Sequence, residues 1–156
     1  MVIGKNYLKK PLIYTIIIIV KLFDKIEYFR MVFFSYLIGN TDMHLKNFSL
    51  IEKQEGSGEY VLSSAYDLLP VNAIMPEDNE EFALTMCKKK RKIKRKDFLL
   101  FADEIGIERI SAEKMIAKVI KNKDKFITMC EESNLSENMK NKLKELIVSR
   151  SNILAE

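Results

Sequence analysis

The segment from Lys21 to Ile38 constrains the fold most, because it predicts one long helix with a wide apolar face. Gly39 follows the last apolar position and predicts the end of this helix, since glycine tolerates the left-handed conformation of a C-terminal cap. A hydrophobic share of 47% in 156 residues excludes an intrinsically disordered chain and suits one domain, or one lobe of a larger protein. Apolar side chains recur in the segment at spacings of three and four, namely Phe23, Ile26, Phe29, Phe33 and Leu37, widened by Val32 and Tyr36.

Two short apolar segments further along predict a β-hairpin. Phe48–Ile51 and Tyr60–Leu62 flank a polar loop, 52–59, which contains two glycines. A stretch between Pro70 and Pro76 is expected to be irregular, and Phe82–Met86 is expected to form another short strand. The fold class is therefore α+β, mostly α, with one embedded β-hairpin. The remaining expected helices are 97–105, closed by Gly106; a second from an N-cap at Ser111 to about Cys130; and a last one after an N-cap at Ser136.

An apolar run at the N-terminus, Leu12–Val20, requires a separate interpretation. Its nine residues are too few for a membrane helix, which needs about 20, so no membrane span is predicted. No small-residue cleavage site follows the run, which disfavours a signal peptide. We interpret it as a buried helix or strand and leave its conformation open, together with its possible role as a contact surface.

Cysteine and charge patterns exclude other classes. Cys87 and Cys130 cannot make a disulfide framework, which favours a reducing cytoplasm, and a single histidine excludes a structural zinc site. The run Lys88–Lys96 holds 8 of the 26 basic residues, so the remaining chain has 18 basic against 22 acidic residues. No aromatic residue interrupts this run, which makes direct nucleic-acid binding an unfavoured interpretation. We favour the interpretation that this run forms a solvated turn and the start of a helix. A role of the run in docking a partner stays open.

Three polar side chains form the candidate reaction centre. Asp42 and Asn47 lie five residues apart in a polar segment before the hairpin, and Asp67 follows the second strand. Because a hairpin brings its two ends together, we expect these three to meet. An aspartate that orients a hydroxyl, with an amide and a carboxylate that hold magnesium, is the set and the order that protein kinases use. Lys46 would add a positive charge against the transferred phosphate.

The segment Ile38–Ile51 resembles the catalytic loop of the HipA family of kinase-fold serine/threonine kinases. Ser64–Pro70 resembles the metal-binding segment of that family, and the likeness extends over about 21–154. It implies a protein-kinase-like C-terminal lobe at 21–156, preceded by an unmatched segment, 1–20. It also implies Asp42 and Lys46 as catalytic residues and Asn47 and Asp67 as Mg²⁺ ligands. The nucleotide-binding residues that it implies are His44, Leu45, Lys46, Asn47, Tyr66 and Asp67. His44 could instead only brace the loop.

The resemblance implies transfer of the ATP γ-phosphoryl group to a protein hydroxyl, as in the toxins of bacterial toxin–antitoxin modules. The expected partners are a protein substrate and an antitoxin or an N-terminal kinase lobe. Thr41, and not arginine, precedes Asp42, and none of the five glycines belongs to a phosphate-covering loop. The chain alone is therefore expected to bind ATP weakly and to be inactive. The alternative is a truncated, inactive remnant that acts only as a partner-binding module.

Overall fold

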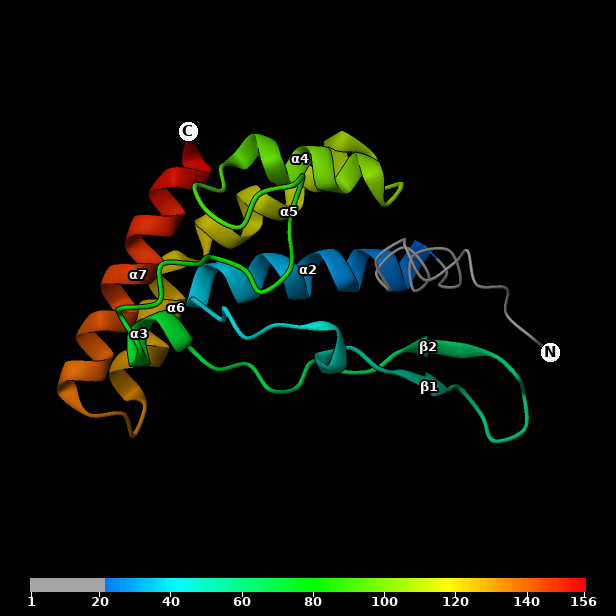
Figure 1. Cartoon of the computed structure of the whole chain (residues 1–156), viewed down its shortest axis with the longest axis horizontal. Coiled ribbons are helices and arrows are strands. Elements are labelled where there is room, and N and C mark those ends of the chain that lie inside the picture. Colours follow the sequence, from blue (N-terminus) through cyan, green and yellow to red (C-terminus); the bar gives the residue numbers. More distant parts are fainter. Residues whose placement is uncertain (1–21) are drawn as a thin grey trace.

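The computed structural model describes residues 22–156, so the expectations for the apolar run Leu12–Val20 lie outside the described part. The described chain is mostly helical with one two-stranded antiparallel sheet, which confirms the α+β class. Among residues 22–156, no helix combines the length and the apolar character needed to cross a bilayer. The elements, shown in Figure 1, are α2 (Leu22–Ile38), a 3-10 turn (Leu45–Asn47), β1 (Leu50–Glu52), β2 (Tyr60–Leu62), α3 (Val71–Ile74), α4 (Arg95–Glu104), α5 (Arg109–Lys121), α6 (Lys123–Glu132) and α7 (Glu137–Ala155).

Helix α2 forms the centre of the core, as its apolar stripe predicted. Phe29, Phe33 and Tyr36 are each at most 2% exposed. The ring of Phe98 from α4 packs edge-on against all three, at centroid distances of 6.4, 4.9 and 5.2 Å. Edge-to-face pairs of this kind contribute about 0.5–1.5 kcal/mol beyond the burial of their area. The aromatic face of α2 therefore holds α4 in place.

The end of α2 is fixed by the predicted glycine cap. Gly39 has a φ of +77°, its N–H donates to the Tyr36 carbonyl, and the Asn40 N–H donates to the Ser35 carbonyl. These two bonds define a Schellman motif, in which the chain turns sharply away from the helix axis. The polar segment that begins at Asn40 therefore leaves the helix in one defined direction.

The predicted hairpin forms and attaches to the far end of α2. Leu50 pairs with Leu62, and Glu52 pairs with Tyr60. The Asp24 carboxylate accepts a hydrogen bond from the Leu62 N–H at 3.0 Å, which ties β2 to the first turn of α2. From β2 the chain runs back beside α2 to α3, near the other end of that helix (Figure 1).

The stretch between Pro70 and Pro76 is not wholly irregular, because it contains the one-turn helix α3. Helix α7 supplies a buried side chain, Arg150, that fixes this turn. Its guanidinium donates to the Asn72 side-chain oxygen at 2.5 Å and also to the Tyr36 carbonyl, and it lies 4.6 Å from the centroid of the Tyr36 ring. A turn this short has few internal hydrogen bonds, so these tertiary contacts stabilise it.

The expected strand at Phe82–Met86 is wrong. The segment has only one isolated bridge, between Met86 and Lys89, and the chain reverses there through left-handed residues at Cys87 and Lys88. Phe82 and Met86 are nevertheless buried, at 2% and 5% exposure. Phe82 and Met86 therefore anchor a loop in the core and do not belong to a strand.

The expected continuous helix from Ser111 to Cys130 is also corrected. Helix α5 begins earlier, at Arg109, and Asn122 separates it from α6. The Asn122 side-chain amide donates to the Lys118 carbonyl at 2.6 Å, a bond that competes with the backbone pattern of a helix. The N-cap at Ser136 is confirmed, since its hydroxyl accepts from the Met139 N–H at 3.4 Å.

The basic run contains structural ion pairs. Lys89 donates to Asp97 at 2.6 Å, and Asp97 is 2% exposed. The same carboxylate accepts from the Lys94 N–H at 2.9 Å, at the start of α4. Lys90 pairs with Glu80 at 2.9 Å. Two of these lysines therefore stabilise the local turn and the start of α4.

The glycine cap generates a stability prediction. A Cβ atom at Gly39 would lie 2.4 Å from a methyl carbon of Leu146 and 3.1 Å from Asn72. Gly39→Ala should therefore add an overpacking penalty of about 1–3 kcal/mol to the left-handed penalty of about 1–2 kcal/mol. The measurement is the free energy of unfolding in urea.

The matched control is Gly58→Ala in the hairpin loop. Gly58 also has a left-handed φ, of +67°, but its added Cβ would meet nothing within 4 Å. This variant should lose only the stability that the left-handed conformation costs a residue with a Cβ atom, about 1–2 kcal/mol. Equal losses of stability in the two variants would contradict the overpacking argument and show that Leu146 and Asn72 move aside to admit the added carbon.

Candidate functional site

Two loops lie side by side and form the site. One is 39–49, between α2 and β1, and the other is 63–70, between β2 and α3. The Ser63 N–H donates to the Ser49 carbonyl at 2.8 Å, next to the hairpin. At the other end, the Asn72 N–H donates to the Gly39 carbonyl at 3.0 Å. The loops therefore run antiparallel between two fixed ends, as an irregular continuation of the hairpin.

Asn47 lies where the predicted side chains meet. Its side-chain nitrogen donates to the Asp67 carboxylate at 3.2 Å and to the Asp42 backbone carbonyl at 3.1 Å. Asn47 is buried, while Asp42 and Asp67 are exposed. The structure therefore brings together the three residues that the hairpin argument joined, with Asp42 touching Asn47 through its backbone.

Asp67 has an unusual backbone conformation, with a φ of +55°. Aspartate adopts the left-handed region more readily than most residues, but the conformation still needs support from its surroundings. Buried Asn40 supplies that support, since its side-chain nitrogen donates to the Asp67 carbonyl at 3.1 Å. Asn40 and Asn47 thus hold the backbone and the carboxylate of Asp67 respectively.

Tyr66 joins the two loops on their exposed side. Its hydroxyl donates to the Lys46 carbonyl at 2.8 Å and lies 2.6 Å from the Ser49 hydroxyl. Because the single phenolic proton is used on Lys46, Ser49 is the donor in the second bond. The ring itself is 39% exposed. Tyr66 therefore positions the loop and also presents an aromatic face to solvent.

The other predicted residues occupy the short turn between Asp42 and Asn47. Leu45, Lys46 and Asn47 form the 3-10 turn, and the Lys46 side chain is exposed. His44 is half-buried, and its Nδ1 atom is buried with no hydrogen-bond partner among the described residues. Such an atom usually binds water or a ligand group. A role in nucleotide binding and a role in bracing the loop both stay open for His44.

The donor set suits a magnesium ion. Asp67 offers an exposed carboxylate, and both hydrogen bonds of the Asn47 side chain in residues 22–156 use its nitrogen, which leaves its oxygen as a possible ligand. These are the hard oxygen donors that Mg²⁺ prefers, and this ion commonly keeps waters and phosphate oxygens as its other ligands. Within the described residues no cluster of three or more histidine, cysteine, aspartate or glutamate side chains forms a closed metal cage.

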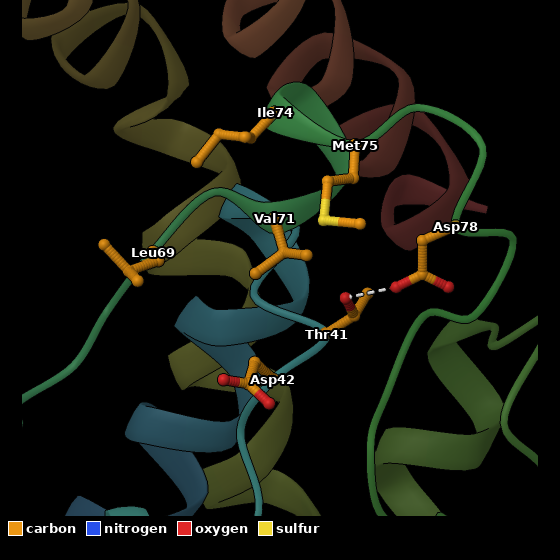
Figure 2. A pocket seen from close by; sticks show the side chains of 7 residues that line it. All are labelled: Thr41, Asp42, Leu69, Val71, Ile74, Met75 and Asp78. Carbon is orange, nitrogen blue, oxygen red and sulfur yellow. Dashed lines mark hydrogen bonds between the residues drawn. The ribbon is translucent and has the colours of Figure 1, made fainter.

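A hollow of about 360 Å³ opens beside Asp42 and was not anticipated from the sequence. Figure 2 shows Asp42 at one end of it and Ile74 and Met75 at the other. One wall is fixed by Thr41, whose hydroxyl donates to the Asp78 carboxylate at 2.6 Å. This bond, with a second from the Glu80 N–H, lowers the pKa of Asp78 below its ordinary value. The remaining residues that line the hollow are Leu69 and Val71.

Comparison with known proteins identifies the family of this chain. The HipA-like C-terminal domain family matches residues 16–126, and the chain belongs to it. A protein of Haemophilus influenzae named "Putative kinase" is 29% identical over 115 residues, which are 64% of this chain and 33% of that protein. "Putative kinase Y4dM" of Sinorhizobium fredii is 45% identical over 67 residues, which are 42% of this chain and 16% of that protein. The matches thus span a third or less of either relative.

The Thr41–Asp78 bond generates a pH prediction. A lowered pKa in the folded state means that this carboxylate contributes stability above its unfolded pKa. The contribution is lost as the pH falls through the lowered folded value. Thr41→Val removes the donor, so the pKa of Asp78 should rise toward its ordinary value, as measured by the ¹³C shift of its carboxyl carbon during an acid titration.

Thr128→Val is the matched control, because the Thr128 hydroxyl bonds the Asp124 carbonyl, in α6, and not the hollow. This variant should leave the titration of Asp78 unchanged. An unchanged pKa of Asp78 in Thr41→Val would show that the hydroxyl does not hold the carboxylate in solution.

Proposed function

We propose that this member of the HipA-like family is the catalytic lobe of a serine/threonine protein kinase, with a protein-kinase-like C-terminal fold. The proposal rests on one observation, the meeting of Asp42, Asn47 and Asp67 where the two loops converge. The names of the two relatives support the same reaction class. The reaction is transfer of the γ-phosphoryl group of ATP to a protein hydroxyl.

Asp42 is the proposed proton acceptor. Its exposed carboxylate lies at the edge of the hollow, where a substrate hydroxyl can approach. In the transfer, the hydroxyl oxygen forms a bond to the γ-phosphorus, and the bond from that phosphorus to the bridging oxygen of ADP breaks. ADP leaves with the electron pair, and the hydroxyl proton passes to Asp42. General-base help of this kind contributes roughly 100- to 10,000-fold in rate.

Asn47 and Asp67 are the proposed ligands of Mg²⁺. When bound, the ion would neutralise charge on the ATP phosphates. The chain's own contribution is orientation, since Asn40 fixes the Asp67 backbone and the buried Asn47 fixes the carboxylate beside it. A ligand pair that is already positioned loses little entropy when the ion and nucleotide bind.

The remaining loop residues would contact the phosphate side of the nucleotide. Lys46 extends from the 3-10 turn into solvent, where its ammonium group can approach the transferred phosphoryl group. His44 belongs to the same proposed set, and the residue is half-buried. Leu45 and Tyr66 complete the proposed set. The two hydrogen bonds of the Tyr66 hydroxyl hold the two loops of the site together.

The partners are also proposals. Ile51 and Tyr60 leave large apolar side chains on the hairpin, each at least half exposed. A further kinase lobe, or an antitoxin in a toxin–antitoxin module, could cover them. The same surface would serve an inactive remnant that only binds a partner, which is the alternative function. Binding of metal and nucleotide at Asn47 and Asp67 separates the two, because a remnant has no need of it.

The test uses Mn²⁺–ATP as a paramagnetic probe of the ¹⁵N-labelled chain. Amide signals of residues 42–47 and 66–68 should broaden first as the complex is added. We expect a dissociation constant of about 1 mM, equivalent to about 4 kcal/mol. Asn47→Ala and Asp67→Ala should weaken binding at least about tenfold, which is 1.4 kcal/mol, because each removes one oxygen ligand.

Two controls make this result specific. Asp103→Ala removes an exposed carboxylate from α4 and should change nothing. Asp42→Asn should keep the Mn²⁺–ATP broadening, since its carboxylate is assigned to the hydroxyl and not to the metal. Broadening that ignores the Asn47 and Asp67 substitutions, or that is absent up to 10-fold above about 1 mM ATP, would contradict the proposed function.

A further inference from the structure

A second hollow, of about 430 Å³, is lined by α2, α5 and α6 and shares no lining residue with the hollow of the candidate site. Phe29 and Phe33 of α2 are buried at its base, at 1% and 2% exposure. Phe34 of α2 and Phe126 of α6 also line it, with ring centroids 5.9 Å apart. Met129 of α6 is 65% exposed. This hollow, the α2–α6 groove, is therefore an apolar surface that the described residues leave partly uncovered.

The part of the groove that α5 and α6 supply follows a regular spacing. Its residues, which we call the seam, are Met115, Val119, Asn122, Phe126 and Met129, at steps of four, three, four and three. An average spacing of about 3.5 residues is typical of a helix surface that packs along a second helix. Helix α2 covers the seam only in part, because Met115, Val119 and Phe126 are half-buried and Met129 is exposed. The spacing therefore indicates that one further helix fits beside α2.

The charge on the rim restricts which helix fits. The charged residues that line the groove are Arg30, Lys118 and Lys125, all exposed, and no acidic residue of 22–156 is among them. Arg30 already pairs with Glu27, whereas Lys118 and Lys125 have no ion pair within the described part of the chain. Each of these two lysines directly precedes an apolar seam residue, which is where charges that select the partner flank the contact of two helices. The rim therefore favours carboxylates and repels basic segments.

We propose that the α2–α6 groove binds an acidic amphipathic helix of a partner protein. Its apolar side chains pack on the seam and on Phe34, and the carboxylates beside them pair with Lys118 and Lys125. The chain's own apolar run, Leu12–Val20, does not match this surface, because lysines flank it on both sides. The inference goes beyond the proposed function and does not depend on it, since no seam residue belongs to the candidate reaction centre.

The experiment titrates designed helical peptides into the ¹⁵N-labelled chain and follows its amide signals. The first peptide has leucines at alternating steps of three and four, with glutamates beside them. The second has alanines in place of the leucines, and the third has lysines in place of the glutamates. Shifts should centre on 33–34 and 115–129. The first peptide should bind at least about tenfold more tightly than either of the others.

The double variant Lys118→Glu with Lys125→Glu tests the rim. Both positions are exposed, so the chain should stay folded, and the preference for the glutamate peptide over the lysine peptide should disappear or reverse. The matched control is Lys114→Glu with Lys121→Glu, which makes the same change of charge at exposed positions of α5 outside the groove. The control should keep the preference for glutamates, because surface charges away from the contact are largely screened by salt.

Met129→Asp tests the seam, and Ile110→Asp is its control. Both residues are 65% exposed, but of the two only Met129 lines the groove. Met129→Asp should weaken binding of the first peptide at least about tenfold, and Ile110→Asp should leave it unchanged.

Three results would overturn the inference. The first is equal binding of the leucine and alanine peptides, and the second is a set of shifts centred on another surface. The third is a concentration-dependent dimer of the chain alone that shifts the same amides, which would assign the groove to a second copy of this chain.

Discussion

The guanidinium of Arg150 is the interaction on which the geometry of the site depends. It is buried where α7 meets α3 and the last turn of α2. It donates to the main-chain oxygen of Tyr36 in α2 and to the side-chain oxygen of Asn72 in α3. Burial lowers the pKa of Arg150, which shows that removing this charge from water has an energetic cost. The bonds to Tyr36 and Asn72 and the contact with the Tyr36 ring offset that cost.

This contact transmits its constraint to the reaction centre through Asn72. The Asn72 N–H holds the Gly39 carbonyl, its side-chain nitrogen holds the 78–80 segment, and its oxygen is held by Arg150. Gly39 begins the loop that carries Asp42 and Asn47, while Asn72 lies in α3, directly after the loop that carries Asp67. At the other end of both loops, Asp24 anchors the hairpin. Fixing both ends leaves the intervening side chains few alternative positions, which is what phosphoryl transfer requires.

The sequence predicted what depends on local pattern and missed what depends on distant contacts. The stripe of α2, the glycine cap, the hairpin and the meeting of Asn47 with Asp67 follow from periodicity and from the return of a hairpin to its start. Arg150 lies 114 residues from Tyr36, and Asp78 lies 37 from Thr41, so no periodicity joins them. Helix α3 was missed for the same reason, because a four-residue turn is stabilised by its surroundings and not by its own propensity.

The electrostatic arrangement supports the proposal of a cation at this centre. Asp42 and Asp67 converge on one amide nitrogen, that of Asn47, which donates to the backbone of the first and the carboxylate of the second. A neutral donor shared in this way stabilises a carboxylate by less than a full charge would. Asp67 also adopts a left-handed backbone conformation, which has an energetic cost and is supported by the hydrogen bond from Asn40. This conformation presents the Asp67 carboxylate to solvent. On the proposed function, a divalent ion bound by Asp67 and the Asn47 oxygen would supply positive charge here, and the same ion would attract the phosphates of a nucleotide toward Asp42.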